Sequence, residues 1–96
     1  MGHYIGSPLR QITHQKVAYT GTAGTISNAV GAQSYAVRVI VTTEAFVKIG
    51  DAPTATANDM YMAPDREEYF IITPGQKVSA IQEASGGTLH VTEMSR

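Results

Sequence analysis

The sequence contains no cysteine and no tryptophan, and only 16% of its 96 residues are charged. Without cysteine, the chain can form neither a disulfide nor a thiolate metal site. A chain of this length forms one domain with a limited core, and small domains that lack a covalent or metal cross-link are commonly stabilised by association. The composition therefore favours oligomerisation or docking on a larger partner.

An excess of charge of one sign is also missing. Seven Lys and Arg residues face eight Asp and Glu residues, which leaves a formal net charge of −1, and the basic residues are scattered singly. Nucleic-acid-binding proteins usually present a basic face, so we expect no nucleic-acid partner. No apolar run reaches about 18 residues, and the first residues lack the basic and apolar regions of a signal peptide. We therefore expect no membrane partner and a protein made in a cytoplasm that stays there or joins an assembly.

Helical signals are weak, because no window of about twelve residues carries a sustained apolar pattern of period 3.6. Val, Ile, Thr and Tyr dominate the ordered stretches, and Gly or Pro interrupts them at short intervals. This pattern predicts an all-β fold, a small antiparallel β-sandwich (jelly-roll-like) of about seven or eight short strands. Residues 1–11 are predicted to form an extended N-terminal arm, because Gly6, Ser7 and Pro8 disfavour regular structure. Residues 12–96 form the single β-sandwich domain of this prediction.

Alternation with period two is clearest after Tyr35, where Val37, Val39 and Val41 fall on one face of a strand. Ile40 is apolar on the opposite face, which favours a strand covered on both sides. Alternation is poor in the first predicted strand. The strands predicted along the chain are 12–20, 35–42, 45–49, 60–62, 68–73, 77–84 and 88–94.

Turn-forming residues separate these strands. Pro74-Gly75 has the residue order of a type II turn, and Ser85-Gly86-Gly87 is typical of a hairpin connection. A loop of small residues is predicted between the first two long strands, over residues 21–31. Its apolar members Ile26 and Val30 are expected to anchor it to the core.

Residues that could carry chemistry are sparse. His3, His14 and His90 lie on separate segments without ligand spacing, so no metal site is predicted, and His14 and His90 are interpreted as half-exposed strand residues. The acidic residues between Asp65 and Glu68 follow a proline and indicate a solvated loop. No serine has a nucleophile elbow and no glycine set has a phosphate-binding context. We therefore predict no catalytic residue, no cofactor and no enzymatic activity.

Two segments are candidate protein interfaces. The first is the N-terminal arm, because apolar residues in an unstructured arm commonly pack on a surface, either of the domain itself or of a neighbour. The second is a short segment of Met and Tyr followed by Pro; it is either a core strand with its tyrosine pointing outward or an interaction patch. The candidate interface residues are Tyr4, Ile5, Pro8, Leu9, Met60, Tyr61, Met62 and Pro64.

The chain from Tyr35 onward resembles small structural proteins encoded among the virion genes of tailed bacteriophages. The resemblance lies in AVRVIVTTEAFVKIGDAPTATANDMYM and in EYFIITPGQKVSAIQEASGGTLHVTEMSR. It consists of a valine-rich strand, a loop rich in Ala, Pro and Thr, a Pro-Gly turn and the ending GGTLHVTEM. The resemblance implies a capsid decoration or cement protein that is assembled into a virion in the host cytoplasm. It also implies a major capsid protein, or another virion protein, as partner, and a homo-oligomeric state.

Two other functions remain open at this point. The chain is alternatively a minor component of the tail or of the head–tail connector, built on the same sandwich. A less favoured alternative is a small carbohydrate-binding module that uses Tyr61 or Tyr69 as a stacking platform.

Overall fold

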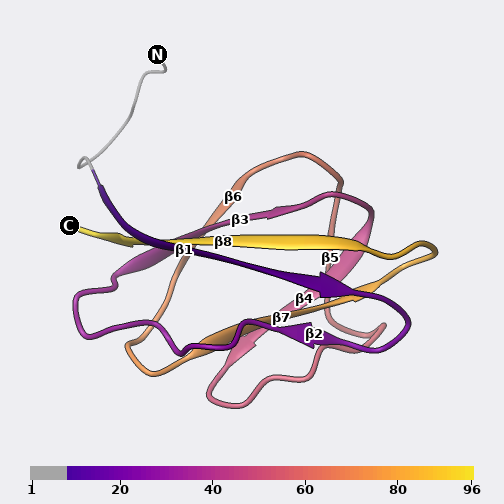
Figure 1. The fold of residues 1–96 in the computed structure, drawn as a ribbon, viewed down its shortest axis with the longest axis horizontal. Coiled ribbons are helices and arrows are strands. Elements are labelled where there is room, and N and C mark those ends of the chain that lie inside the picture. Colours follow the sequence, from indigo (N-terminus) through magenta and orange to yellow (C-terminus); the bar gives the residue numbers. More distant parts are fainter. Residues whose placement is uncertain (1–8) are drawn as a thin grey trace.

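A computed structural model describes residues 9–96 of the chain as eight β-strands joined by loops, with no helix among them. Figure 1 shows the strands as arrows in chain order. Within these residues there is accordingly no helix of the length and apolarity that crossing a membrane requires. The strands are β1 (Arg10–Tyr19), β2 (Gly24–Thr25), β3 (Ala36–Val41), β4 (Ala45–Gly50), β5 (Met60–Met62), β6 (Glu68–Ile71), β7 (Lys77–Gln82) and β8 (Gly87–Ser95).

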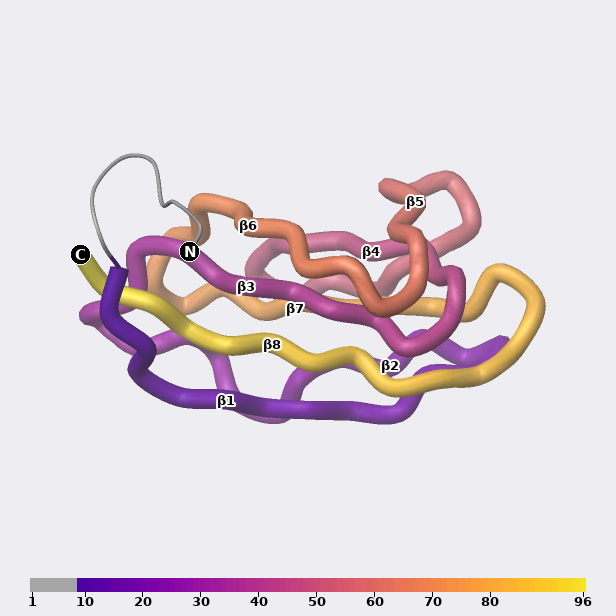
Figure 2. Tube along the Cα trace, turned by 90° about the horizontal axis from the view of Figure 1, so that it is seen from above, coloured from indigo at the N-terminus to yellow at the C-terminus, as the bar shows by residue number. Residues whose placement is uncertain are grey.

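The strands form two four-stranded antiparallel sheets. Sheet A has the order β1-β8-β3-β6 and sheet B has the order β2-β7-β4-β5. Every connection crosses from one sheet to the other except the one between β4 and β5, which is the strand order of a jelly roll. In Figure 2, β1 and β2 run along one side of the sandwich, and β5 and β6 run along the opposite side. The predicted antiparallel β-sandwich is confirmed.

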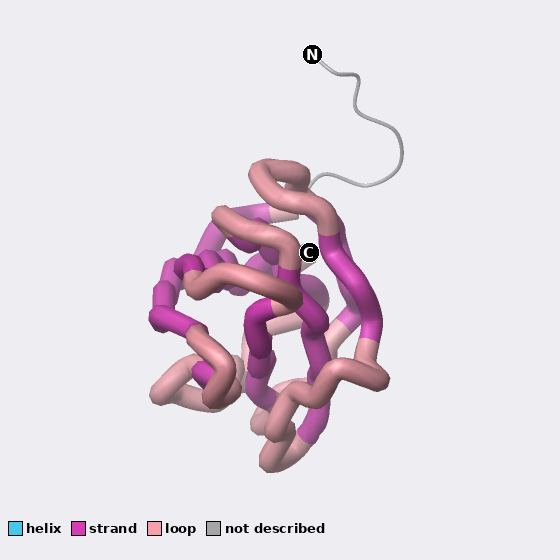
Figure 3. Tube along the Cα trace, turned by 90° about the vertical axis from the view of Figure 1, so that its right-hand side faces the viewer, coloured by secondary structure: helices cyan, strands magenta, loops and turns pink. Residues whose placement is uncertain are grey.

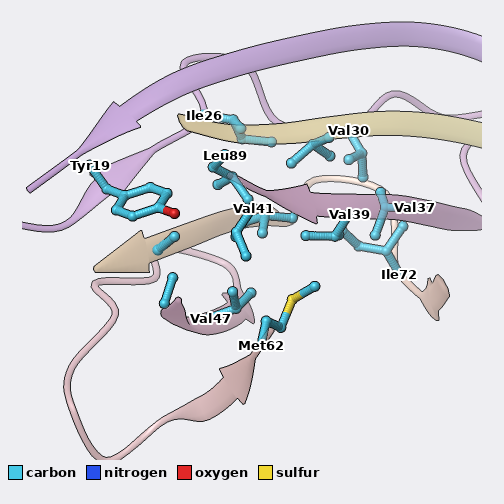
Figure 4. Packing of buried hydrophobic residues seen from close by; sticks show 14 residues of the cluster. Tyr19, Ile26, Val30, Val37, Val39, Val41, Val47, Met62, Ile72 and Leu89 are labelled. Carbon is cyan, nitrogen blue, oxygen red and sulfur yellow. The ribbon is translucent and has the colours of Figure 1, made fainter. Parts of the chain in front are cut away.

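The core lies between the two sheets, as the close view in Figure 4 shows. In sheet A the odd positions of β3 point inward, so that Val37, Val39 and Val41 have no exposed surface, and Leu89 and Val91 of β8 are equally buried. The three valines of β3 share one face, as their alternation predicted. Tyr19 at the end of β1 completes the contribution of sheet A. Sheet B and the loops contribute the remaining large members, which are Ile26, Val30, Val47, Met62, Ile72 and Val78.

The first strand begins earlier than predicted. β1 starts at Arg10, because Arg10 and Gln11 pair with Ser95 and Met94 of β8. The register shifts between Gln11 and His14, and this β-bulge explains the poor alternation of the sequence in this region. The rest of the predicted arm, apart from Leu9, lies outside the described residues. A further strand, β2, interrupts the predicted loop of residues 21–31.

The predicted hairpin at Ser85-Gly86-Gly87 is wrong. This segment carries the chain from β7 in sheet B to β8 in sheet A, so the two strands are not neighbours. A β-carbon at Gly87 would meet the hydroxyl oxygens of Thr42, Thr43 and Tyr19. The glycine is therefore required by close packing at the end of the sandwich and does not mark a hairpin turn.

One carboxylate is buried in sheet A. Glu93 lies opposite Val37 on the inner face of β8 and is only 5% exposed. Its Oε1 accepts hydrogen bonds from the Ser34 hydroxyl at 2.6 Å and from the Gly31 backbone N–H at 3.0 Å. Glu93 thus attaches the segment that leads into β3 to the last strand of the sheet. Within residues 9–96, every buried side-chain N or O atom has a hydrogen-bond partner.

Candidate functional site

The two predicted interface segments lie on opposite sides of the sandwich. Leu9 is half-buried next to β1, which is an edge strand of sheet A, whereas residues 60–64 belong to β5 and the turn after it, at the far edge of sheet B. The other arm candidates, Tyr4, Ile5 and Pro8, lie outside the described residues. Leu9, the one arm candidate that the structure describes, is therefore not part of the same surface as residues 60–64.

The second segment combines core and surface. Met62 is 3% exposed and packs in the core, so it holds β5 in place and is not available to a partner in this conformation. Met60 and Tyr61 are 42% and 49% exposed, and Pro64 is exposed in the following turn. The burial of Met62 and the exposure of Tyr61 match a core strand whose tyrosine points outward, because β5 is an edge strand that is buried on one side only. The exposed residues Met60, Tyr61 and Pro64 stay predicted interface residues.

Tyr61 is the exposed, edge-strand member of an aromatic and aliphatic surface on the outer face of sheet B. Phe46 of β4 lies opposite both Tyr61 of β5 and Ile81 of β7. The rings of Phe46 and Tyr61 meet edge-to-face, with centroids 6.1 Å apart and planes at 65°. We call Phe46, Tyr61 and Ile81 the Tyr61 patch. Phe46 and Ile81 were not predicted as surface residues of interest, because the alternation within one strand does not reveal which residues of other strands become its neighbours.

Two carboxylates border the Tyr61 patch. Partial desolvation, a hydrogen bond to the Glu44 carboxylate and the negative charges of Glu44 and Glu83 raise the pKa of the Tyr61 phenol above 10.0. The hydroxyl therefore remains protonated and acts as a hydrogen-bond donor across the physiological pH range. The backbone joins the same two residues, because the Glu83 N–H donates to the Glu44 carbonyl oxygen at 3.0 Å. An apolar patch with an acidic border suits a partner that presents apolar and basic side chains.

The loop of residues 51–59 borders the Tyr61 patch on the side that faces β2. Pro53 and Ala55 of this loop are buried against the outer face of sheet B. The Ser79 hydroxyl of β7 accepts a hydrogen bond from the Ala55 N–H at 3.0 Å, and the Thr25 hydroxyl donates to the Pro53 carbonyl oxygen at 3.2 Å. The loop thus covers the part of sheet B near β2 and leaves the part near β5 open.

A shallow hollow lies at the end of the sandwich next to the Tyr61 patch. Figure 3 views this end, where loops stand in front of the strands. The hollow has a volume of about 350 Å³ and lies between the turns that follow β3, β5 and β7. Asp65 adopts a left-handed backbone conformation there, with φ of 58°, and its N–H donates to the Val41 carbonyl oxygen. The lining residues are Thr42, Thr43, Glu44, Pro64, Asp65, Ala84 and Ser85.

Two histidines that are far apart in the sequence come together on the outer face of sheet A. His14 of β1 and His90 of β8 are stacked with ring centroids 5.4 Å apart, and His14 Nε2 lies 3.3 Å from His90 Nδ1. His14 Nδ1 lies 3.0 Å from the Thr92 hydroxyl. Both histidines are strand residues, as predicted, with His14 exposed and His90 half-buried. Their contact was not predicted, because the β1–β8 register was not visible in the sequence. Within the described part of the chain, no three His, Asp or Glu side chains are grouped as a metal site would need.

We expect this histidine pair to make the stability of the protein depend on pH. Partial burial, followed by the positive charges of His14 and Lys16, lowers the pKa of His90 below 6.5. Because the unfolded chain then binds the proton more readily than the folded chain, stability is present above the unfolded pKa and is lost as the pH falls through the lower folded pKa. The melting temperature should therefore be lower near pH 5.5 than near pH 7.5, and His90→Gln should reduce this difference. An equal pH dependence in the two proteins would contradict this assignment.

Comparison with protein-family models, with curated proteins and with solved structures finds no match to this chain.

Proposed function

We propose that this protein is a structural component of a tailed-phage virion that binds the capsid and stabilises it as a cement or decoration protein. The jelly roll supplies a rigid core, and the Tyr61 patch supplies the surface that contacts the shell. A protein that binds the assembled shell and not the free subunits stabilises the shell by mass action. The resemblance of residues 35–96 to small virion proteins supports the same function.

The observation that carries the proposal is the position of the exposed apolar side chains. Among the described residues, the exposed large apolar side chains are Ile12, Met60, Tyr61, Tyr69 and Ile71. All except Ile12 lie on β5 and β6, the two edge strands on one side of the sandwich. Tyr61 lies on the outer face of sheet B, whereas Tyr69 and Ile71 lie on the outer face of sheet A, so these side chains border one edge of the sandwich from both faces. Exposed apolar groups gathered along one edge are typical of a protein–protein interface, and tyrosine is enriched at such interfaces.

The proposal is tested by counting the protein in purified virions by quantitative mass spectrometry. A copy number of the same order as that of the major capsid protein supports a cement or decoration protein. A handful of copies per particle supports the alternative, a minor component of the tail or head–tail connector. Absence from the virion would refute both and would leave the carbohydrate-binding alternative, which a glycan array with the Tyr61→Ala and Tyr69→Ala variants tests.

Truncation of Tyr61 should weaken binding to the shell. We expect Tyr61→Ala to bind capsids that lack the protein about 10- to 30-fold more weakly than the unaltered chain, as for a tyrosine at the centre of an interface. Co-sedimentation with such capsids over a concentration series measures this. Ile12→Ala is the matched control, since Ile12 is 42% exposed on the opposite side of the sandwich. Equal binding by Tyr61→Ala and the control would remove the Tyr61 patch from the interface.

The contribution of the arm needs a separate variant. Removing residues 1–8 leaves β1 intact, because that strand begins at Arg10. Weaker co-sedimentation of this variant with an unchanged melting temperature would support the predicted contacts of Tyr4, Ile5 and Pro8. Unchanged co-sedimentation would exclude them.

A further inference from the structure

The four sheet edges of this molecule are unequally protected against pairing with another strand. Natural edge strands are commonly protected by bulges, charges, proline or short length. β1 has a bulge and carries Arg10 and Lys16, β2 has two residues and β5 has three. β6 has four residues in regular register with β3 and exposes Tyr69 by 53% and Ile71 by 73%. Among the described strands, β6 therefore has the edge most open to pairing.

The unpaired backbone groups of β6 belong to the residues with the most exposed side chains. The Ile72 N–H donates to the Tyr35 carbonyl oxygen at 3.0 Å, and Phe70 lies opposite Val37 in the ladder. Because hydrogen-bonded positions alternate along an antiparallel pair, the even residues of β6 direct their N–H and C=O groups to β3. The N–H and C=O groups of Tyr69 and Ile71 consequently point away from the sheet.

We propose that β6 pairs with β6 of a second copy of this chain, antiparallel and across a two-fold axis at Phe70. The two four-stranded sheets A then form one continuous eight-stranded sheet. Tyr69 of each copy lies opposite Ile71 of the other copy, in a position where both residues exchange N–H···O bonds. On the outer face of sheet A, the pairing forms two contacts between the ring of Tyr69 and the β-branched side chain of Ile71. An aromatic residue opposite a β-branched residue is a favourable cross-strand pair.

The choice of register follows from symmetry and composition. A two-fold axis perpendicular to the sheet keeps the inner faces of both copies on the same side, so an inward residue must lie opposite an inward residue. In such a register one residue of β6 lies opposite the same residue of the other copy, and the axis passes between these two. An axis at Tyr69 would place Glu67 opposite Ile71, and an axis at Ile71 would place Tyr69 opposite Thr73. Only the axis at Phe70 pairs both exposed apolar side chains with each other.

Charges and the following turn agree with this register. Glu67 of one copy lies opposite Thr73 of the other copy. Since Thr73 is six positions from Glu67 in the same chain, the two Glu67 residues are about 20 Å apart along the strand at a rise of about 3.3 Å per residue. This separation exceeds the screening length of about 8 Å, so the acidic ends of the two strands do not repel each other appreciably. Pro74, which has no N–H, lies at the end of the paired segment, where it costs no ladder hydrogen bond.

The dimer has a consequence for the proposed docking surface, although the dimer itself does not depend on that function. A two-fold axis perpendicular to sheet A leaves both copies of sheet B on the same side. The outer faces of sheet B, each with its Tyr61 patch, therefore point in the same direction. Two equal patches on one side of a rigid dimer bind a repetitive surface bivalently, which raises the apparent affinity above that of a single patch.

The oligomeric state of the purified protein tests the proposal. Light scattering coupled to size exclusion should give twice the chain mass of 10.2 kDa. Ile71→Lys should give a monomer with an unchanged far-UV spectrum, because a side chain that is 73% exposed contributes little to the fold of one copy. Ile12→Lys, on the bulged edge, should remain a dimer. A wild-type monomer, or a dimer that persists in Ile71→Lys, would overturn the proposal. Because this test uses no capsid, its failure leaves the proposed function standing.

Engineered cysteines test the register itself. The chain has no cysteine, so any cross-link arises from the introduced residues. The double variant Tyr69→Cys, Ile71→Cys should form interchain disulfides under mild oxidation, because directly opposite residues have Cα atoms about 5.5 Å apart, within the range of a disulfide. Each single variant should stay uncross-linked. Efficient cross-linking of Tyr69→Cys alone or Ile71→Cys alone would establish a different axis, and no cross-linking of the double variant would refute the pairing.

Discussion

Gly24→Ala should destabilise the protein by about 3 kcal/mol, as overpacking against a rigid backbone does. A β-carbon at Gly24 would overlap the Ala18 carbonyl oxygen, and a backbone atom of a paired strand has little freedom to withdraw. Gly24 lies in β2, opposite Ala80 of β7, so relief of the overlap requires the edge of sheet B to move away from β1. Urea unfolding followed by far-UV circular dichroism measures the loss.

The control for this substitution lies three residues away. A β-carbon at Gly21 would meet nothing closer than Gln82 Nε2 at 3.8 Å, which is ordinary contact distance. Gly21→Ala should therefore change the free energy of unfolding by less than about 0.5 kcal/mol. Comparable losses in the two variants would show that loop flexibility, and not the contact with Ala18, sets the cost at Gly24.

Glu93→Ala should lower the free energy of unfolding by about 3 kcal/mol, because it leaves the buried Ser34 hydroxyl and the partly buried Gly31 N–H without their acceptor. The Ser34 hydroxyl and the Gly31 N–H both donate to the same Glu93 oxygen, and among residues 9–96 neither group has another acceptor. A domain of this size has a total stability of about 5–15 kcal/mol, so this loss is a large part of the whole. The change in the midpoint of urea unfolding measures it.

A graded series separates the effect of hydrogen bonding from that of the buried charge at this position. Glu93→Gln keeps an acceptor oxygen for both donors and should lose only about 1 kcal/mol. Glu83→Ala, which removes an exposed carboxylate in the turn after β7, should be close to neutral. The expected order of stability is Glu83→Ala, then Glu93→Gln, then Glu93→Ala. Equal losses for Glu93→Gln and Glu93→Ala would assign the effect to the buried charge.

The features that the sequence revealed are those set by period-two burial and by local turn chemistry. Val37, Val39 and Val41 form the inner face of β3 as their alternation predicted, and Leu89 and Val91 lie opposite them. Proline followed by glycine indicated a turn before β7, and Gly75 has the positive φ of 94° that this turn type needs. Each of these signals is contained in a short stretch of chain.

The features that the sequence hid depend on pairing between distant strands. The His14–His90 pair and the Tyr61 patch arise from registers that bring together residues from separate strands, and no local pattern specifies those registers. β2 escaped detection because Gly and Thr carry no apolar signal over two residues. Serine and glycine before β8 looked like a hairpin because the same residues also suit a tight crossing between sheets.

The pairing of β1 with β8 determines when the protein can fold during synthesis. β8 lies between β1 and β3 in sheet A, yet it is translated after every other described strand. Until it leaves the ribosome, β1 has no neighbour in its own sheet, and the valines of β3 lack Leu89 and Val91 beside them. Sheet A is therefore completed only once β8 has emerged, and until then the apolar side chains of β1 and β3 remain without their partners in β8, as the kind of transiently exposed surface that promotes aggregation.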